Sequence, residues 1–322
     1  MKQEICTIGI DLGGTKTSFA LVTNQGKIIE ELKITTNKLG GDYILQDMAE
    51  KSLELFESAN KLGYKVEAIG IGSPGRIDTK NGIVSDCTPN IQNWKGISIK
   101  TFFSKHFNLP VFIDNDANIA AFGEYYLRKL QGRTEKTIII LTLGTGLGGG
   151  IIYNDNLFRG GGLGAEIGHT IIEAKGRACN CGQRGCLEMY VSGTGIETQA
   201  RERIFQYPDS QLNSENIDSY KIFELARKND LFCQLLITEM AEYLSYGLIS
   251  LVNIFDPDLI LLTGGISLQH DIYLDDVLNR VQKEINYTNF DKNIIQIAQS
   301  DDKAGLIGAG LIAFHGLERG EI

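Results

Sequence analysis

The sequence comprises 322 residues, 43% of them hydrophobic, which is enough to bury one large core or two moderate ones and excludes a largely disordered chain. Its 31 lysines and arginines are outnumbered by 40 aspartates and glutamates, giving a formal net charge of −9, and the basic residues form no cluster. We therefore expect two folded domains and no nucleic-acid partner, because a nucleic-acid-binding surface needs concentrated positive charge.

The N-terminal stretch "MKQEICTIGIDLGG" lacks the long apolar segment of a signal peptide. We find no run of about 18 apolar residues that would predict a membrane span. We expect a cytoplasmic protein with no membrane partner, in which the six cysteines form no disulfide framework. Cys6, Cys87 and Cys233 stand alone and are interpreted as small buried hydrophobic residues.

The first half has the pattern of an α/β domain. Residues 5–34 alternate β-branched and apolar residues around a glycine turn at 13–14 and a second turn at 24–27, which predicts three antiparallel strands. A helical pattern follows at about 41–62, then a strand at 66–72, a helix near 97–107 and a strand at 111–114.

The second half repeats this order. Helical spacing covers 118–130, and residues 137–160 again predict strand, glycine turn, strand, turn and strand. Helices dominate from about 193 to 254, followed by a strand at 259–265, a helix near 275–286, a strand at 294–298 and a small-residue helix at 304–314. Two α/β domains that each open with a glycine-turned meander indicate an ancient duplication.

Three glycine turns are candidates for nucleotide contacts. In "DLGGTKT" (11–17) and "LGTGLGGG" (143–150), bare backbone amides could approach phosphate, although a plain hairpin turn also explains the first stretch. The second satisfies G-x-G-x-x-G but continues as a strand, which argues against a dinucleotide fingerprint, and no P-loop motif occurs. "LTGGIS" (262–267) could receive a flat ring, or it is an ordinary strand-to-helix turn.

A carboxylate-rich stretch lies between a predicted strand and a predicted helix. Asp114, Asn115 and Asp116 occupy "DND", where Asn115 or Asp116 could simply cap the helix. The alternative is a general base, because phosphoryl transfer to a hydroxyl needs a carboxylate that accepts the proton and orients the oxygen.

One histidine and three cysteines are concentrated in "GHTIIEAKGRACNCGQRGCLE" (168–188). His169, Cys179, Cys181 and Cys186 make a complete Cys₃His set for zinc, and four protein ligands favour a structural site over a catalytic one. Three unrelated free thiols are the weaker alternative. Glu166 and Glu188 flank the set, and converging carboxylates suit a polyhydroxylated ligand, which points to a sugar.

These motifs together resemble the ROK family of sugar kinases and repressors, within the actin-like ATPase superfamily. The resemblance covers essentially the whole chain and rests on "DLGGTKT", "GSPG" (72–75), "TPNIQNW" (88–94), "DNDAN", "LGTGLGGG", "GAEIGH" (164–169), "CNCGQRGCLE" (179–188) and "LTGGIS". One departure is Ala165, where the family more often has glycine before the glutamate.

The resemblance implies a role for each matching residue. Asp116 is implied as the catalytic base, and Mg²⁺ is implied near Asp11. Sugar contacts are implied for Gly75, Asn90, Asn115, Asp116, Glu166, His169 and Glu188. Contacts to ATP are implied for Asp11, Gly13, Gly14, Thr15, Lys16, Gly144, Thr145, Gly146, Gly264 and Gly265, and zinc ligation for His169, Cys179, Cys181 and Cys186.

The resemblance also implies an architecture. We expect an α/β fold of two actin-like (ribonuclease H-like) domains with an interdomain cleft and a structural zinc site. The first is expected at residues 1–115, joined by the C-terminal helix 304–322, and the second at 116–303. Family members are often dimers, so a homodimer using the helical stretch 220–254 is a hypothesis.

The implied activity is ATP-dependent phosphorylation of a hexose, most simply glucose to glucose 6-phosphate. N-acetylmannosamine, N-acetylglucosamine and fructose are alternative acceptors, and polyphosphate is an alternative donor. A sugar-sensing regulator is the non-enzyme alternative. A repressor is disfavoured because the first predicted strand begins at residue 5, which leaves no space for a preceding helix-turn-helix segment.

Overall fold

The fold was analysed in a computed structural model that describes residues 3–86, 91–162, 164–285, 290–298 and 303–320. The chain divides into two compact units. Unit 1 comprises Met1–Thr134, Asp155–Ala165 and Ser300–Ile322, and unit 2 comprises Glu135–Asn154 and Glu166–Gln299. Residues 116–134 thus group with unit 1, whereas the sequence analysis placed them in the second domain, because the helix at 116–130 packs against the C-terminal helix.

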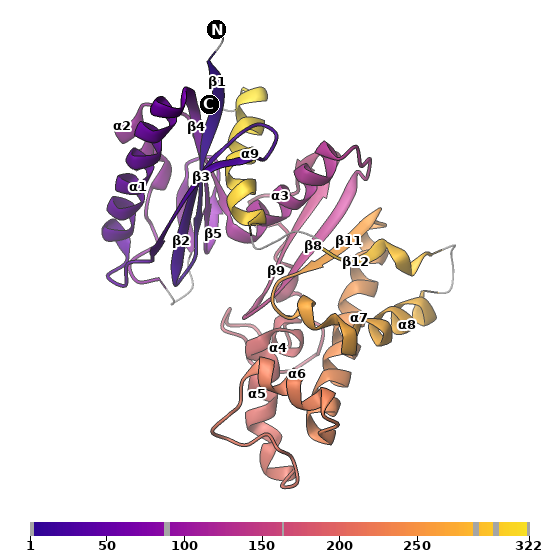
Figure 1. Ribbon diagram of the computed structural model, residues 1–322. Helices are drawn as coiled ribbons and strands as arrows, with labels where there is room; N and C mark the ends of the chain where they lie inside the picture. Colours follow the sequence, from indigo (N-terminus) through magenta and orange to yellow (C-terminus); the bar gives the residue numbers. More distant parts are fainter. Residues whose placement is uncertain (1–2, 87–90, 163, 286–289, 299–302, 321–322) are drawn as a thin grey trace. The chain divides into compact units, whose positions relative to one another are not determined.

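Unit 1 is built on a five-stranded sheet with helices on its faces (Figure 1). The strand order is β3-β2-β1-β4-β7, in which β1 to β3 are antiparallel and β1, β4 and β7 are parallel. The sheet strands are β1 (Glu4–Leu12), β2 (Lys16–Val22), β3 (Ile28–Thr35), β4 (Tyr64–Ser73) and β7 (Val111–Asn115), and a separate pair is formed by β5 (Arg76–Asp78) and β6 (Ile83–Asp86). Its helices are α1 (Gly41–Leu62), α2 (Ile99–Phe107), α3 (Asp116–Leu130) and α9 (Ala304–Glu318).

The parallel part of this sheet brings three of the expected motifs to one edge. Asp11 on β1 pairs in register with Gly72 on β4, and Gly72 pairs with Asp114 on β7. Because parallel strands end at the same edge, "DLGG", "GSPG" and "DND" all begin there.

Unit 2 repeats the arrangement with the strand order β9-β8-β11-β12. These strands are β8 (Thr137–Leu143), β9 (Leu147–Tyr153), β11 (Leu259–Thr263) and β12 (Ile295–Ile297). The third strand expected in 137–160 is only the two-residue β10 (Asn156–Leu157), whose residues belong to unit 1. The helices are α4 (Glu188–Val191), α5 (Gly193–Arg203), α6 (Ser219–Arg227), α7 (Leu231–Phe255) and α8 (Leu274–Glu284).

Helix α7 is long and apolar enough to cross a membrane by length and composition alone. It packs, however, against α4, α6 and α8, and twelve of its residues, from Phe232 to Val252, are buried. It also carries Glu239 and Glu242, and Glu239 pairs with Arg203 of α5. These contacts are those of a core helix. Cys6 and Cys233 are fully buried, as expected, whereas Cys87 lies outside the described residues.

Helix α9 lies directly on the sheet of unit 1 because glycines remove side chains from both surfaces. A Cβ added at Gly70 of β4 would lie 1.7 Å from the Ala309 carbonyl oxygen, and one at Gly9 of β1 would lie 2.6 Å from the Leu306 oxygen. The buried Thr7 hydroxyl donates a 2.8 Å hydrogen bond to the Gly310 oxygen. The C-terminal segment is therefore an integral part of unit 1.

We expect Gly70→Ala to lower the free energy of unfolding by about 1–3 kcal/mol, because the added methyl group meets backbone that cannot rotate away. Thermal or urea unfolding measures the change. Gly161→Ala is the matched control, since a Cβ there meets no atom within 4 Å. Equal stability of the two variants would show that α9 does not depend on this close approach.

Candidate functional site

The start of α3 decides between a helix cap and a separate role for Asp116. The Asn115 side-chain oxygen accepts hydrogen bonds from the amides of Ala117, at 2.9 Å, and Asn118, at 3.3 Å. Asn115 is therefore the N-cap, and Asp116 is the first helical residue. Asp116 also accepts from the Ala117 amide at 2.9 Å. Its carboxylate thus lies at the positive end of the helix, where negative charge is stabilised.

Asn115 also joins the "DND" and "GSPG" stretches. Its side-chain nitrogen donates a 2.9 Å hydrogen bond to the oxygen of Gly75, which adopts a φ of 96° that favours glycine. Two residues earlier, the Ser73 hydroxyl accepts a 2.9 Å bond from the indole of the buried Trp94. Three of the stretches expected to hold sugar therefore meet within unit 1. Asn90, expected among them, lies outside the described residues.

Asp114 is a buried carboxylate whose partner the sequence did not reveal. Its oxygens accept from the Arg159 Nε at 2.5 Å, the Asn118 amide group at 2.9 Å and the Asn115 backbone amide at 2.7 Å. The side chain of Asp114 is 3% exposed and that of Arg159 is 33% exposed, so the carboxylate is shielded from water while the guanidinium is partly accessible. Arg159 begins a glycine-rich segment without any motif that marks it as the partner of Asp114.

The first glycine loop is the turn between β1 and β2. The Gly13 amide donates to the Lys16 oxygen at 2.9 Å, and the Thr36 hydroxyl donates to the Gly13 oxygen at 2.7 Å. Gly14, Thr15 and Lys16 are exposed. The stretch is thus a hairpin turn, and it also leaves its backbone and hydroxyl groups accessible to a phosphate.

Asp11 precedes this turn, close to the start of α9. A Cβ at Gly305 would lie 3.1 Å from its Oδ2. Burial raises the pKa of Asp11, and the charges of Lys16 and Lys33 oppose that rise. A cation at this carboxylate would offset its desolvation.

The second glycine loop connects β8 to β9 in unit 2. The Gly144 amide donates to the Gly146 oxygen at 3.0 Å, and the chain continues as strand, as the sequence predicted. The loop is also bonded to the start of α5, since the amides of Gly193 and Thr194 donate to the oxygens of Gly144 and Thr145 at 2.8 and 3.1 Å. Its position is therefore fixed by a helix that follows almost 50 residues later.

A cavity of about 340 Å³ lies beside this loop within unit 2. Gly144, Thr145 and Gly265, for which the sequence predicts nucleotide contacts, are among its lining residues. Gly264 allows the end of β11 to approach β8, because its φ is 92° and a Cβ there would lie 2.4 Å from the Leu143 oxygen.

The rest of this cavity is formed by residues that no motif in the sequence had indicated. They come from α5, α6 and the segment after β11, and include Thr194, Glu197, Ser219, Tyr220, Phe223 and Gln269. They combine aromatic rings with groups that can bond hydroxyls and ring nitrogens, which suits a nucleoside. The only local signal was "SGTG" at 192–195, a small-residue helix start.

The four expected metal ligands form a compact cluster in unit 2. Their donor atoms all lie within 4.8 Å of one another. The Cys179 Sγ is 3.7 Å from the His169 Nδ1, and the Cys181 Sγ is 3.6 Å from the Cys186 Sγ. Ligands at about 2.0–2.3 Å from a tetrahedral zinc ion are separated by similar distances. The cluster therefore fits a single zinc ion.

Two glycines allow the cysteine segment to fold this tightly. Gly182 and Gly185 adopt φ values of 89° and 79°. The turn is closed by the Cys179 amide, which donates to the Gln183 oxygen at 2.9 Å. A Cβ at Gly185 would lie 1.9 Å from the Glu173 oxygen, so only glycine fits there.

The two flanking glutamates have different environments. Glu188 Oε2 accepts a 2.9 Å hydrogen bond from the Leu147 amide, and Oε1 lies 3.9 Å from the Cys179 Sγ. Glu188 thus links the cysteine cluster to the second glycine loop. Glu166 is exposed and precedes the short 3₁₀ helix Ile167–His169. Ala165 before it has a φ of 68°, which explains why the family pattern favours glycine at this position.

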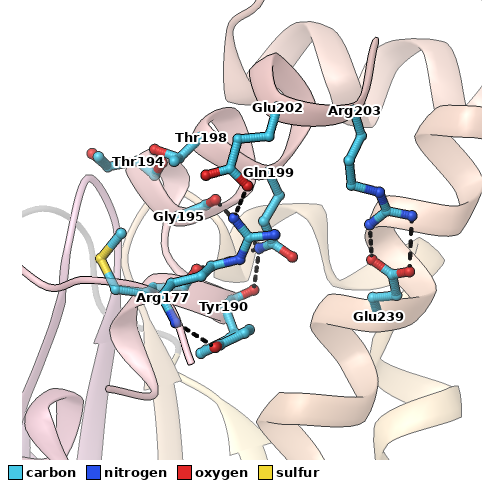
Figure 2. A network of polar contacts seen from close by, with 10 residues as sticks. Arg177, Tyr190, Thr194, Gly195, Thr198, Gln199, Glu202, Arg203 and Glu239 are labelled. Atoms are coloured by element: carbon cyan, nitrogen blue, oxygen red, sulfur yellow. Dashed lines mark hydrogen bonds and ion pairs between the residues drawn. The ribbon is translucent and has the colours of Figure 1, made fainter. Parts of the chain in front are cut away.

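A polar network holds the cysteine segment against α5 and α5 against α7 (Figure 2). Arg177 pairs with Glu202, and its backbone amide donates to the Tyr190 hydroxyl at 3.0 Å. The Arg203 guanidinium forms a two-point ion pair with Glu239, with one bond of 3.0 Å. The start of α5 lines the cavity, so this network fixes one cavity wall relative to the metal-ligand cluster.

Comparison with known proteins agrees with these features. A model of the ROK family matches residues 7–315. The glucokinase of Thermotoga maritima is 34% identical over 314 residues, which is 95% of this chain and 96% of that protein. The structure of the ROK hexokinase from Thermus thermophilus is similar with a TM-score of 0.85 at 32% identity, covering 98% of this chain and 99% of that one.

The ROK family glucokinase from Streptomyces griseus, solved in complex with glucose and AMPPNP, has a TM-score of 0.77 at 33% identity and covers 97% of this chain and 100% of that one. The α/β units described above therefore have the fold of ROK kinases. From the extent of the family match and of these similarities, we conclude that the chain belongs to the ROK family.

Proposed function

We propose that the protein transfers the γ-phosphoryl group of ATP to a hexose hydroxyl, and that glucose is the acceptor, giving glucose 6-phosphate. The observation that carries this proposal is the start of α3, where Asn115 caps the helix and binds the "GSPG" turn while the adjacent Asp116 supplies a carboxylate. The glucokinase relatives support glucose as the acceptor and ATP as the donor.

Asp116 is the catalytic base in this proposal. Its carboxylate accepts the proton of the attacking hydroxyl and orients the oxygen toward the γ-phosphorus. The backbone amides and threonine hydroxyl of the turn at 11–16 are proposed to bind phosphate, and Asp11 would hold Mg²⁺ there. A phosphate contact is proposed separately for the loop at 144–146. The nucleoside occupies the cavity beside Gly144 and Gly265.

The family pattern implies sugar contacts for Gly75, Asn90, Asn115, Glu166, His169 and Glu188, and we propose these residues as the sugar-binding set. In His169, the Nδ1 faces the Cys179 sulfur, so this nitrogen is the metal ligand and the Nε2 is left to bond a hydroxyl.

The Cys₃His cluster holds a structural zinc ion. Four protein ligands leave no open coordination position, so the metal stabilises the local fold and takes no part in the chemical step. Glu188 contacts both the cluster and the Leu147 amide, so a metal held by the cluster would support the second glycine loop through this side chain.

A panel of sugars tests the activity. We expect glucose-dependent release of ADP from ATP, with kcat/KM for glucose above the values for N-acetylmannosamine, N-acetylglucosamine and fructose. Polyphosphate in place of ATP tests the alternative donor. Sugar binding by calorimetry without ADP release for any sugar would favour the sensor alternative and contradict the proposal.

Asp116→Asn tests the base. We expect kcat to fall by about 10²–10⁴-fold while glucose affinity changes little, because the amide keeps the shape but accepts no proton. Asp42→Asn is the matched control, since Asp42 is also an acid in the first turn of a helix, α1, and is exposed. A normal kcat for Asp116→Asn would show that this residue only favours the helix start.

Cys181→Ala tests the metal. We expect about one zinc ion per chain in the purified protein and none in the variant, because three remaining ligands hold zinc far more weakly. Glucose affinity should fall more than nucleotide affinity. Cys233→Ala, which removes a buried thiol outside the cluster, should keep its zinc. Freshly purified protein without zinc by elemental analysis would refute this part of the proposal.

A further inference from the structure

A second cavity lies within unit 1, and none of the residues assigned above to sugar, nucleotide or metal is among its lining residues. Its volume is about 300 Å³. Its walls are the turn after β5, the first turn of α2, strand β7, the segment from β10 to Arg159, and the end of α9. The floor is apolar, formed by residues of β7, β10 and α9 such as Val111, Leu157 and Ile312.

The polar lining of this cavity is basic. Lys80, Lys100, Arg159, Arg319 and His315 line it, and no aspartate or glutamate is among the lining residues that the structure describes. This is unusual in a chain with a net charge of −9. Thr79 adds a hydroxyl group and Asn156 an amide.

The turn that carries Lys80 is bonded to the start of α2, which carries Lys100. Gly82 has a φ of 64°, and a Cβ there would lie 2.1 Å from the Lys100 Cβ. The Lys100 amide donates to the Gly82 oxygen at 3.3 Å, and the Gly82 amide donates to the Asp78 oxygen at 2.7 Å. The turn that carries Lys80 is thus docked on the start of α2.

These lysines are only partly neutralised in the described part of the chain: hydrogen bonds from Asn81 lower the pKa of Asp78, and the nearby charge of Lys80 adds to that lowering. Neither Lys80 nor Lys100 forms an ion pair with any residue that the structure describes. Asp78 is the nearby acid in the same turn, and its carboxylate accepts bonds of 3.1 and 2.7 Å from the backbone and side chain of Asn81. The ammonium groups of Lys80 and Lys100 both line the cavity and repel each other. A bound anion would offset this repulsion.

The opposite wall is also fixed. A Cβ at Gly316 would lie 2.1 Å from the ring of Phe112, so the last turn of α9 is pressed onto β7. Arg319 is bonded to Asn156. Arg159 uses its Nε for Asp114, and its two terminal nitrogens make no hydrogen bond with the described part of the chain, which leaves them for a ligand.

We propose that this cavity binds a small phosphate-bearing anion. Arginine and lysine donors with a hydroxyl and an amide match the oxygens of a phosphate group, and the apolar floor accommodates a short organic part. A volume of about 300 Å³ is within the range of small-ligand sites. The ligand would share Arg159 with Asp114, whose strand leads directly to Asp116. Binding itself does not depend on the proposed kinase activity.

Calorimetric titration with three probes tests the site: inorganic phosphate, pyrophosphate and glucose 6-phosphate, each without nucleotide. We expect saturable 1:1 binding of at least one probe that weakens as sodium chloride is raised. The probe that binds tightest distinguishes an inorganic anion from a sugar phosphate. No saturable binding of any of the three would overturn the proposal.

Charge reversal locates the binding. The double variant Lys80→Glu/Lys100→Glu should weaken binding by about tenfold or more, because two favourable charges become repulsive. Lys27→Glu/Lys61→Glu changes the net charge equally at exposed positions of unit 1 that do not line the cavity, and should bind as the wild type does. Lys80→Gln/Lys100→Gln replaces the first variant if it does not fold. Equal binding by the lysine-pair variant and the control would place the anion elsewhere, for example on the glycine loops.

Glucose phosphorylation by the same variants separates this inference from the proposed function. Lys80 and Lys100 have no role in the proposed transfer, so basal kcat without added anion should be unchanged. Loss of anion binding with normal turnover supports the cavity. Absence of kinase activity in every variant, wild type included, would contradict the proposed function and leave the binding result intact.

Discussion

The hydrogen bonds of the Asn115 side chain join the start of α3 to the "GSPG" turn, and the candidate site in unit 1 depends on them. The oxygen of this amide caps α3, and its nitrogen binds the Gly75 carbonyl, so a helix start and a glycine turn are fixed by one planar group. An aspartate at this position would keep the acceptor but lose the donor. Because Asn115 performs the capping, the carboxylate of Asp116 is presented at the positive end of the helix rather than being used to start it.

This junction is rigid because the groups around it are buried and paired. Asp114 is satisfied by Arg159, Asn118 and a backbone amide, which compensates the cost of burying its charge. Strand β7 is in register with β4, and β4 with β1, so the carboxylate of Asp11 is held by the same sheet. Helix α9 packs on β1 and β4 through glycines, and its first turn lies near Asp11. The proposed catalytic base, Asp116, and the proposed cation-binding acid, Asp11, are thus carried by one framework.

In unit 2, the second glycine loop is held in position by hydrogen bonds to neighbouring segments. This loop is short and contains no bulky side chain, so its conformation depends on neighbours. Glu188 binds the Leu147 amide, α5 binds the loop through Gly193 and Thr194, and the cysteine segment supports both. A metal ion at the cysteines would therefore act on the loop through contacts already present.

Much of this arrangement was predictable from the sequence because its signals are local. The strand–turn–strand pattern of residues 5–34 predicted β1 to β3, and the helical pattern at 41–62 predicted α1. The Cys₃His cluster could be predicted because three of its ligands lie within eight residues in a glycine-rich turn. The sequence could not predict whether Asn115 or Asp116 caps the helix, because both residue types cap helices well. Only the hydrogen bonds in the structure distinguish them.

The sequence by itself determined the α/β class, the glycine turns and the Cys₃His cluster, because each depends on residues close together in the chain. Only the tertiary structure decided that α3 belongs with unit 1, that residues from α5 and α6 complete the unit 2 cavity, and that Arg159 pairs with Asp114. These features join segments far apart in sequence. Such pairings follow from how sheets and helices pack, and neither residue of a pair carries a local pattern that identifies the other.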